Sequence, residues 1–557
     1  MNSHRARRGP ALAAATLASA VVLLGLFGLT ACVSREPREP RAEQVFRARM
    51  REDPPDIDPV QSGDSLSDQV NFEIHDGLLG LDPASLEVVP AVAEAWEVSG
   101  DGLQYTFHLR GDVRFHNGRK ATADDVLYSF TRILDPKTNS KRREVLAAVK
   151  GAGSFSQGKT ARVEGLEKVD PQTVRITLEE PLPHFLQLLT MAAASIVPRE
   201  VYDDPQKGYL THPVGCGPFQ FSRWERSNFL ELKAFGDYYR GRPKLDRILF
   251  RFIENPASAM QEYRSGGLEW MDEFPGSETD IARDLPGDYR KGPYLASYFY
   301  GMNLARAPFK GNPALRKAFN YAVNKEAICA QTWEGAHTPA HGILPPGIPG
   351  YDPNLRGYPY DPPRAREFLA RAGYPEGKGL PEIDLWVNNN EKHVQAAQRV
   401  QADLKAAGIP VRIKAVDFAT LLQGAGGTAD SPGEALLYRF GWQADYPDPN
   451  AFLYPLLHSR NFGPAGNMGR YSNPKVDQLL DQARTMTRTD ERTRLYREVE
   501  RIAVEEDAVW LFTSNYTSRV LIKSYVKGVV LSPLGSNRIP LDRLWLEEPV
   551  GAGAEKR

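Results

Sequence analysis

Residues 88–136 read VVPAVAEAWEVSGDGLQYTFHLRGDVRFHNGRKATADDVLYSFTRILDP. In the middle of this stretch, apolar side chains alternate with polar ones from Leu103 to Leu109, the pattern of a strand with one buried face. Thr122 can cap a helix that follows, and apolar residues from Val126 to Leu134 recur at the spacing of one helical face. The sequence therefore predicts a strand and then a helix in this region.

The second half of the chain repeats this alternation. IDLWV (Ile383–Val387) has the composition of a strand, and apolar residues from Val394 to Leu404 predict a helix that ends at Gly408. VRIKAV (Val411–Val416) predicts the next strand. A strand, a helix and a strand of this length indicate a parallel pair joined by a right-handed crossover. We therefore assign the chain to the mixed α/β class, with at least two lobes.

Further helix and strand signals are spread along the second half. Asn312-Pro313, Asp361-Pro362 and Asn473-Pro474 each combine a capping side chain with a proline at the first helical position, so each predicts a helix start. A longer helix is predicted from about Asp490 to Glu506, and an apolar strand from Ala508 to Asn515.

The overall composition is typical of a large soluble protein. The chain has 557 residues, of which 41% are hydrophobic and 25% charged, enough for about three to four domains. The formal net charge is −1, from 69 basic and 70 acidic residues. Because there is no basic excess to neutralise phosphates, we do not expect nucleic acid as a partner.

The first 32 residues have the pattern of an export signal. Basic residues at positions 5, 7 and 8 precede an uncharged stretch from Gly9 to Cys32. Its end, LTAC, resembles the bacterial lipobox, in which the cysteine becomes the lipid-carrying N-terminus. We therefore predict a lipoprotein signal peptide at 1–32 and a tether at 33–48. The alternative is an uncleaved membrane anchor, because the uncharged stretch is long enough to span a bilayer.

Cysteine usage excludes several kinds of site. The chain has three cysteines, Cys32, Cys216 and Cys329, and no CxxC motif, so zinc ribbons and thioredoxin-type redox motifs are excluded. We expect Cys216 and Cys329 to be buried free thiols. A disulfide between them is the alternative if the chain is exported.

Motifs of known enzymes are weak or missing. Ser156–Lys159 fits the S-x-x-K pattern, but no S-D-N or K-T-G accompanies it, and the chain has no H-E-x-x-H, G-x-S-x-G or P-loop. We interpret His337 and His341 as loop residues rather than a metal pair, because Pro339 between them disfavours a helix. We predict no catalytic residues, no metal site and no cofactor.

Residues 441–450, GWQADYPDPN, contain the strongest candidates for ligand binding. Arg439 lies six residues before Asp445, and the backbone is expected to be extended through Gly441. An unpaired aspartate can hold an ammonium group, and an arginine can hold a carboxylate through two parallel hydrogen bonds. Together they would bind both ends of a zwitterion. The alternative is that Arg439 and Asp445 pair with each other or cap local turns.

Four segments of the chain together resemble one protein family. They are the stretch at 88–136, VGCGPF at 214–219, YFYGMNLARAPFKGNPALRKAFNYAVNKEAI at 298–328, and GWQADYPDPNAFLYPLLHS at 441–459 with NMGRYSNPKVDQLLDQA at 467–483. The chain is similar to the bacterial extracellular solute-binding proteins of family 5, which serve oligopeptide, dipeptide, opine and nickel ABC importers. The resemblance runs from about residue 50 to 545. One departure is Cys216, where the family usually has Thr or Ser; because a thiol donates hydrogen bonds weakly, a ligand contact there is not expected.

The resemblance implies a two-lobed, periplasmic-binding-protein-like α/β fold of type II, of the large peptide-binding type, with an extra small domain. The expected ranges are 49–80, 205–295 and 515–557 for the main domain of lobe 1, 81–204 for the extra small domain on lobe 1, and 296–514 for lobe 2. The lobes would close over a ligand about two hinge strands, near Tyr294–Met302 and Leu511–Tyr516.

The resemblance also implies a function and a set of site residues. The chain would capture short peptides outside the cytoplasm and deliver them to an ABC permease. Asp445, unpaired before binding, would hold the peptide ammonium, and Arg439 would hold a carboxylate. Trp442 would line the pocket, and Gly441 and Tyr446 belong to the same predicted ligand-binding site.

Other functions compatible with the sequence stay open at this point. The same fold could bind a nickel chelate, an opine or an oligosaccharide. From other classes, an envelope hydrolase and a structural lipoprotein are the alternatives to the non-enzymatic receptor. The expected location is the periplasm or cell surface, with the chain a monomer anchored to a membrane by lipid on Cys32.

Overall fold

The computed structural model describes residues 43–203, 212–464 and 466–547. The predicted signal peptide, Cys32 and residues 33–42 of the predicted tether lie outside the described residues. From Gln44 onward the chain forms one compact unit.

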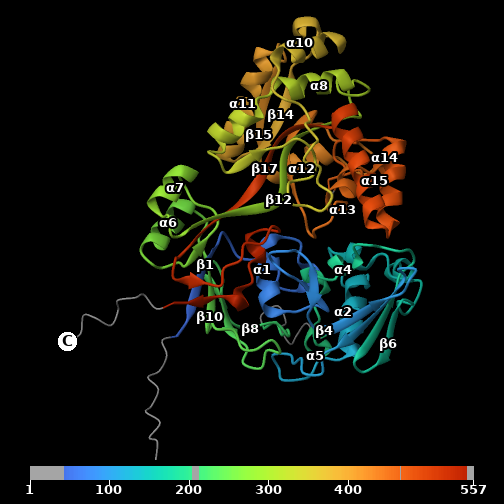
Figure 1. Cartoon of the computed structure of the whole chain (residues 1–557), viewed down its shortest axis with the longest axis vertical. Helices are drawn as coiled ribbons and strands as arrows, with labels where there is room; N and C mark the ends of the chain where they lie inside the picture. Colours follow the sequence, from blue (N-terminus) through green and yellow to red (C-terminus); the bar gives the residue numbers. More distant parts are fainter. Residues whose placement is uncertain (1–42, 204–211, 465, 548–557) are drawn as a thin grey trace, which may run out of the picture. The chain divides into compact units, whose positions relative to one another are not determined.

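A large sheet runs through this unit, in the strand order β15-β14-β16-β12-β17-β11-β1-β10-β9-β8, with β13 paired to β17 (Figure 1). Its strands are β1 (Val45–Met50), β8 (Phe219–Glu225), β9 (Phe229–Ala234), β10 (Arg247–Phe252), β11 (Trp270–Met271), β12 (Tyr289–Met302), β13 (His337–Pro339), β14 (Ile383–Asn388), β15 (Val411–Val416), β16 (Leu437–Gln443) and β17 (Trp510–Ile522). The predicted parallel pair is confirmed, because β14 runs parallel to β15 from Ile383 opposite Val411.

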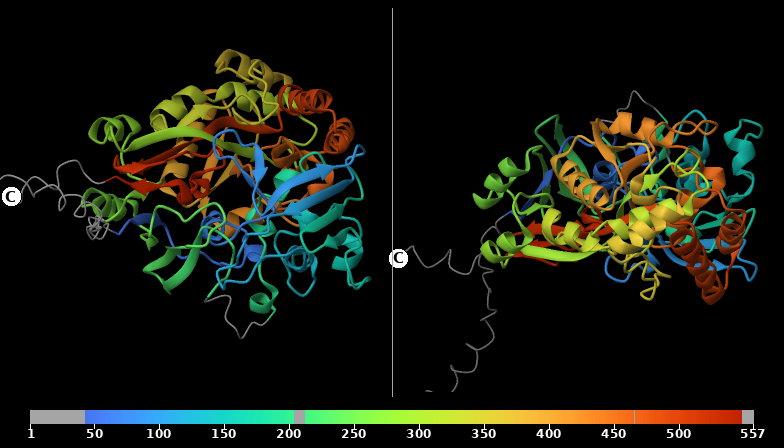
Figure 2. Two further views of the ribbon diagram at one scale, coloured as in Figure 1. Left: turned by 60° about the horizontal axis from the view of Figure 1, so that its bottom comes forward. Right: turned by 90° about the horizontal axis from the view of Figure 1, so that it is seen from above.

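Two long strands, β12 and β17, lie in the middle of this sheet and connect its two halves. They pair in antiparallel fashion from Tyr289 opposite Leu521 to Gly301 opposite Trp510, with irregular register around residues 293–299. The views in Figure 2 show the light-green β12 and the red β17 side by side. Phe299 and Trp510 stack across the pair with ring centroids 3.8 Å apart. Both predicted hinge segments fall within these strands, and their role in lobe closure stays a prediction.

A second, smaller sheet contains the strand predicted at Leu103–Leu109. Its order is β4-β5-β7-β6, formed by β4 (Ala93–Val98), β5 (Gln104–Leu109), β6 (Leu166–Asp170) and β7 (Thr173–Thr177). The helix α2 (Ala123–Leu134) follows, as predicted, and the Asp125 carboxylate accepts the backbone N–H of Thr122 at 2.9 Å. Phe107 and Phe130 are fully buried between the sheet and the helix. Burial of this apolar face is what stabilises the pairing.

The predicted helices of the second half are present. They are α8 (Pro313–Ala322), α10 (Pro362–Arg371), α11 (Glu391–Ala406), α14 (Pro474–Thr485) and α15 (Thr489–Arg501). The side chains of Asn312, Asp361 and Asn473 each accept a backbone N–H in the first turn of the helix that they precede. The predicted long helix is α15 followed by a π-helical turn, Ile502–Glu506, which together end at the expected residue.

The remaining helices and strands are short. They are α1 (Ser65–Ile74), β2 (Leu79–Leu81), β3 (Val88–Pro90), α3 (Ala152–Ser156), α4 (Phe185–Leu188), α5 (Arg199–Tyr202), α6 (Pro256–Arg264), α7 (Glu278–Asp284), α9 (Lys325–Ala327), α12 (Phe418–Gly426), α13 (Asn450–Leu457), β18 (Val526–Lys527) and β19 (Trp545–Leu546). The 3₁₀ turns include η2 (Arg143–Leu146) and η9 (Ser536–Arg538).

Three sequence expectations are corrected or decided here. Strand β1 begins at Val45, inside the predicted 33–48 tether, because Phe46 and Ala48 are buried where β1 pairs with β10. His337 lies in the short strand β13 rather than in a loop. Cys216 and Cys329 are both buried and free, so the disulfide alternative is excluded.

Within the described ranges, no helix combines the length and the apolar character that crossing a bilayer requires. The same ranges contain no group of three or more His, Cys, Asp or Glu side chains placed to hold a metal ion.

A buried carboxyl group in α15 makes the stability of the fold depend on pH. Glu500 is 2% exposed, and its Oε1 accepts the backbone N–H groups of Ile343 and Leu344, both at 2.8 Å. Burial raises the pKa of Glu500 to about 7, from 4.5 for an ordinary glutamate. The folded protein therefore holds this proton more tightly than the unfolded chain does.

We expect Glu500→Gln to gain stability relative to the wild type as the pH rises from about 4.5 to 7. In the wild type, the tighter proton binding of the folded state stabilises the fold in full below about pH 4.5, and this stabilisation is lost as the pH rises through 7. Glutamine does not titrate, so the variant has no such loss. The variant's gain in unfolding free energy relative to the wild type corresponds to about 3 kcal/mol. Urea unfolding of both proteins at pH 4.5 and pH 8 measures it, and an equal difference at both pH values would contradict the assignment.

Candidate functional site

Strand β16 places the predicted cation inside the protein. β16 lies between β14 and β12, with Arg439 opposite Tyr300. Arg439 is 9% exposed, and its guanidinium lies 4.8 Å from the centre of the Tyr298 ring. It donates to the Tyr516 hydroxyl at 3.0 Å and to Asn388 Oδ1 at 3.3 Å. Among the described residues, no carboxylate lies within 4 Å of this guanidinium.

The groups around Arg439 are neutral. His393 faces the same Tyr298, and burial together with the nearby Arg439 lowers the pKa of His393 to about 3. Burial lowers the pKa of His337 as well, so this ring is also uncharged at neutral pH. The Nε of Arg439 is buried without a hydrogen-bond partner among the described residues. A buried cation in neutral surroundings with an unused donor is suited to binding an anion.

Gly441 leaves room for the hydroxyl that Arg439 contacts. A Cβ atom at this position would lie 3.0 Å from the Tyr516 hydroxyl oxygen and 3.3 Å from the Ser297 carbonyl oxygen. Both distances are shorter than ordinary van der Waals contacts. The glycine therefore allows Tyr516 to approach β16 and to reach Arg439.

The two aromatic residues of the motif hold the loop after β16 in place. The Trp442 indole donates to the Ala451 carbonyl at 2.7 Å. Tyr446 stacks on His184 with ring centroids 5.3 Å apart, and its hydroxyl accepts from the Asn450 side chain at 3.0 Å. These contacts tie the loop to α13 and to the small-sheet region. Ligand contact by Trp442 and Tyr446 stays a prediction.

Asp445 is not the unpaired carboxylate that we expected. Its Oδ2 lies 3.4 Å from the guanidinium of Arg142, although the Asp445 side chain is still 38% exposed. Arg142 directly precedes η2, more than 300 residues earlier in the chain, so the sequence contained no signal for this pairing. The alternative in which Arg439 and Asp445 pair with each other is also wrong, because each has other partners.

The second aspartate of the motif is structural. Asp448 is almost fully buried, and both its oxygens accept from the Arg492 guanidinium, at 2.6 and 2.7 Å. This pair lowers the pKa of Asp448 despite its burial. Asp448 and Arg492 thus fix the loop that presents Asp445.

A cavity of about 990 Å³ lies against the hinge strands. Tyr294 of β12 and Tyr516 of β17 line it, and Tyr516 also contacts Arg439. Arg49 of β1 lines one side of the cavity and Asn390 at the start of α11 lines the other. The cavity therefore lies between the two parts of the large sheet that flank β12 and β17. Arg439 and Asp445 are not among the residues that line it, and the Tyr516 hydroxyl connects Arg439 to it.

Sequence reasoning missed most of the side chains that surround the two predicted charges. Tyr298, Asn388 and Tyr516 contact Arg439, and Arg142 contacts Asp445. Residues 511–516 were expected as part of a strand and as a hinge, but not as neighbours of Arg439. The alternation of side chains in β17 could have suggested that Tyr516 faces β16, but nothing in the sequence indicated the strand pairing itself.

Comparison with known proteins identifies the family to which the chain belongs. The model of the family described as "Bacterial extracellular solute-binding proteins, family 5 Middle" matches residues 87–464. The chain belongs to this family of extracytoplasmic solute-binding proteins. The predicted family and the two-lobed α/β fold are thereby confirmed.

Individual relatives are similar along most of their length. Heme-binding protein A of Haemophilus influenzae is 33% identical over 83% of this chain and 85% of its own length. The glutathione-binding protein GsiB of Salmonella choleraesuis is 32% identical over 82% of this chain and 86% of its own.

Solved structures show the same fold. The ABC transporter-associated binding protein DppA of Helicobacter pylori, in complex with the peptide STSA, is 28% identical with a TM-score of 0.76, covering 90% of this chain and 98% of that one. The murein tripeptide binding protein MppA of Escherichia coli is 25% identical with a TM-score of 0.76, covering 91% and 99%.

We expect Gly441→Val to destabilise the fold by about 1–3 kcal/mol, because the added side chain overlaps the Tyr516 hydroxyl. Gly236→Val is the matched control, since a Cβ atom there meets nothing within 4 Å. Urea unfolding of the two variants measures the difference. If Gly441→Val is as stable as Gly236→Val, the close approach of Tyr516 to β16 is wrong.

Proposed function

We propose that this protein captures short peptides in the cavity beside β12 and β17 and delivers them to an ABC permease. The observation that carries the proposal is the buried Arg439 guanidinium, which has no carboxylate partner among the described residues. The names of the relatives support the ligand class, because they include a glutathione-binding protein and a structure with a bound tetrapeptide.

Arg439 holds the C-terminal carboxylate of the peptide in this proposal. The planar guanidinium offers parallel donors that match the two oxygens of a carboxylate. Its neutral, buried surroundings increase the strength of that pair, because little water competes for the charges. Tyr516 and Asn388 already orient the guanidinium, so little conformational entropy is lost on binding.

Asp445 holds the peptide ammonium at the other end. To do so, the ligand displaces Arg142, whose contact of 3.4 Å with Asp445 is long for a charged hydrogen bond. Asp445 is the sixth residue after Arg439, so their backbones lie at most about 20 Å apart. This spacing restricts the ligand to short peptides.

The parts of the sheet on either side of β12 and β17 close over the ligand, and no covalent chemistry takes place. The domain ranges expected from the family resemblance are part of the proposal, with the tether shortened to end before Val45, where β1 begins. The protein acts as a monomer, held to a membrane by lipid on Cys32 after removal of residues 1–31.

The role of Arg439 is tested with tri-alanine and its C-terminal amide. For the wild type, we expect the amide to bind at least tenfold more weakly, because a buried charge pair is lost. For Arg439→Met, the two ligands should bind with affinities within threefold of each other. Isothermal titration calorimetry on the full chain in detergent measures all four affinities. Equal affinity of the wild type for both ligands would remove Arg439 from the site.

We expect Asp445→Ala to weaken tri-alanine binding at least tenfold while leaving the thermal unfolding midpoint within about 2 °C of the wild type. The side chain is partly exposed, so its loss leaves no cavity in the core. Asp430→Ala, at an exposed position outside the cavity, is the control. Unchanged affinity of the Asp445 variant would show that another group binds the ammonium.

A further inference from the structure

One histidine is buried where the small-sheet region meets the loop that carries Asp445. His184 is 3% exposed, and its ring stacks on Tyr446 with an angle of 2° between the ring planes. Its Nε2 lies 3.3 Å from the side-chain amide of Asn450, and its Nδ1 lies 3.5 Å from the guanidinium of Arg492. All three partners come from the second half of the chain, so only the tertiary structure brings them to this ring.

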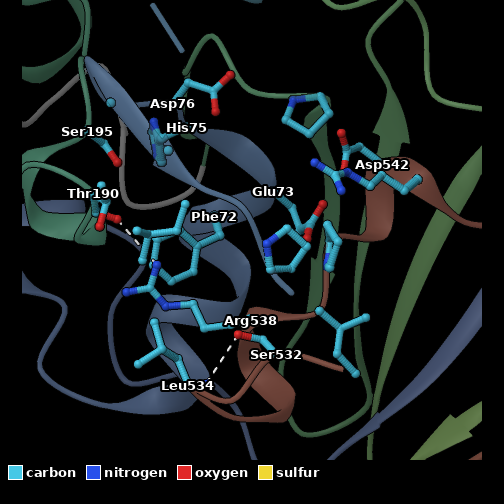
Figure 3. A pocket seen from close by; sticks show the side chains of 18 of the residues that line it. Phe72, Glu73, His75, Asp76, Thr190, Ser195, Ser532, Leu534, Arg538 and Asp542 are labelled. Carbon is cyan, nitrogen blue, oxygen red and sulfur yellow. Dashed lines mark hydrogen bonds between the residues drawn. The ribbon is translucent and has the colours of Figure 1, made fainter. Parts of the chain in front are cut away.

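His184 is fixed to the first half of the chain by the short helix that follows it. Phe185, at the start of α4, is fully buried in the core of the small-sheet region. Just after α4, the Thr190 carbonyl accepts from Arg538 of η9 at 3.3 Å (Figure 3). The Arg538 guanidinium also packs 3.7 Å from the centre of the Phe72 ring in α1. All of these residues fall in the ranges proposed for lobe 1, so His184 belongs to that lobe.

The partners of His184 fall in the range proposed for lobe 2. Tyr446 follows β16 and packs against two apolar cores, that of the small-sheet region and that around β12, β16 and β17. Asn450 begins α13 and Arg492 lies in α15, and these two helices contact each other. The stack of His184 on Tyr446 therefore joins the two proposed lobes directly beside Asp445.

The His184 ring is uncharged in this arrangement. A guanidinium can only donate hydrogen bonds, so the Nδ1 that faces Arg492 has to be an acceptor without a proton. Burial lowers the pKa of His184 to about 4, from 6.5 for an ordinary histidine. Asp448 acts in the opposite direction, and Arg492 and Arg484 lower the pKa further.

The charged groups around the ring already have partners of their own. Asp448 accepts two short hydrogen bonds from Arg492, and Arg484 pairs with Glu180 at 3.0 Å. Burial raises the pKa values of the neighbouring tyrosines, Tyr446 and Tyr496, so their hydroxyl groups stay neutral. Among the described residues, no carboxylate lies within 4 Å of the His184 ring. A proton on this ring would thus place a second cation beside Arg492 without a free counter-charge.

We propose that His184 is a positioning residue, which holds the Asp445 loop against lobe 1 only while its ring is uncharged. This inference rests on the proposed function, in which the lobes separate and close. When they separate, the ring loses Tyr446 and Arg492 and gains water, so it titrates as an ordinary histidine does. Closure over a ligand then requires the ring to give up any proton it holds. Ligand binding therefore weakens in acid.

The size of this effect follows from the difference in proton binding between the open and closed forms. Above about pH 6.5 the ring is neutral in both forms, and the ligand affinity is at its maximum. Between this pH and about 4, the open form holds the proton and the closed form does not. The affinity then falls by up to about tenfold for each pH unit, and by about tenfold from pH 7.5 to pH 5.5.

Calorimetric titration of tri-alanine into the full chain in detergent, at pH 7.5 and pH 5.5, measures the effect. We expect the wild type to bind about tenfold more weakly at pH 5.5. His184→Gln keeps a polar side chain but does not titrate in this range, so its two affinities should agree within threefold. His116→Gln is the matched control. Burial lowers the pKa of His116 to about 4 as well, but its ring contacts Gly215 and Gly217 of the same lobe. This variant should keep the tenfold ratio.

A second measurement uses only the wild type, so it stands even if His184→Gln does not fold. Titrations at pH 6 in buffers of different ionisation enthalpy give the number of protons released when tri-alanine binds. We expect a release of about 0.7 proton, because the open form holds most of a proton on His184 and the closed form holds almost none. Proton uptake, or no release, would contradict the role of His184.

The outcomes separate this inference from the proposed function. If tri-alanine does not bind at pH 7.5, the proposed function itself fails. Equal affinity of the wild type at the two pH values overturns the inference and leaves peptide binding in place. A tenfold loss at pH 5.5 that persists in folded His184→Gln, as judged by circular dichroism at both pH values, assigns the effect to another group and also overturns the inference.

Discussion

The antiparallel pairing of β12 with β17 is the contact on which the rest of the structure depends. In the strand order of the large sheet, it is the single link between β15-β14-β16 on one side and β11-β1-β10-β9-β8 on the other. Phe299 and Trp510 stack across it, and the cavity lies against it. Because backbone hydrogen bonds and apolar packing coincide here, the two strands position both walls of the candidate site.

The site itself is built from charges that the fold leaves incompletely matched. Arg439 is buried among neutral aromatic rings, and Arg142 has only long contacts with carboxylates. Asp448, three residues from Asp445, is by contrast held by short hydrogen bonds from Arg492. A folded protein rarely leaves buried charges unmatched without a function. Within this one loop, the long contact of Asp445 marks it as a binding residue in the proposal, and the short hydrogen bonds of Asp448 mark it as a structural residue.

Much of the fold was predictable because its signals are local. Capping side chains at Thr122, Asn312 and Asp361 and the apolar spacing behind them predicted helices where the structure has them. Strand β1 was mistaken for part of a tether, because its burial comes from pairing with β10, some 200 residues away. The partner of Asp445 was missed for the same reason: Arg142 belongs to another part of the chain.

The sequence by itself determined the family, the α/β class, the positions of most helices and strands, and the two residues, Arg439 and Asp445, on which the proposed site is centred. These follow from side-chain spacing and motif residues that act over a few positions along the chain. Only the tertiary structure decided which of these charges are matched. Electrostatic pairing depends on distances in space, and the partners, Tyr516 for Arg439 and Arg142 for Asp445, come from strands and turns that only the folded sheet brings together.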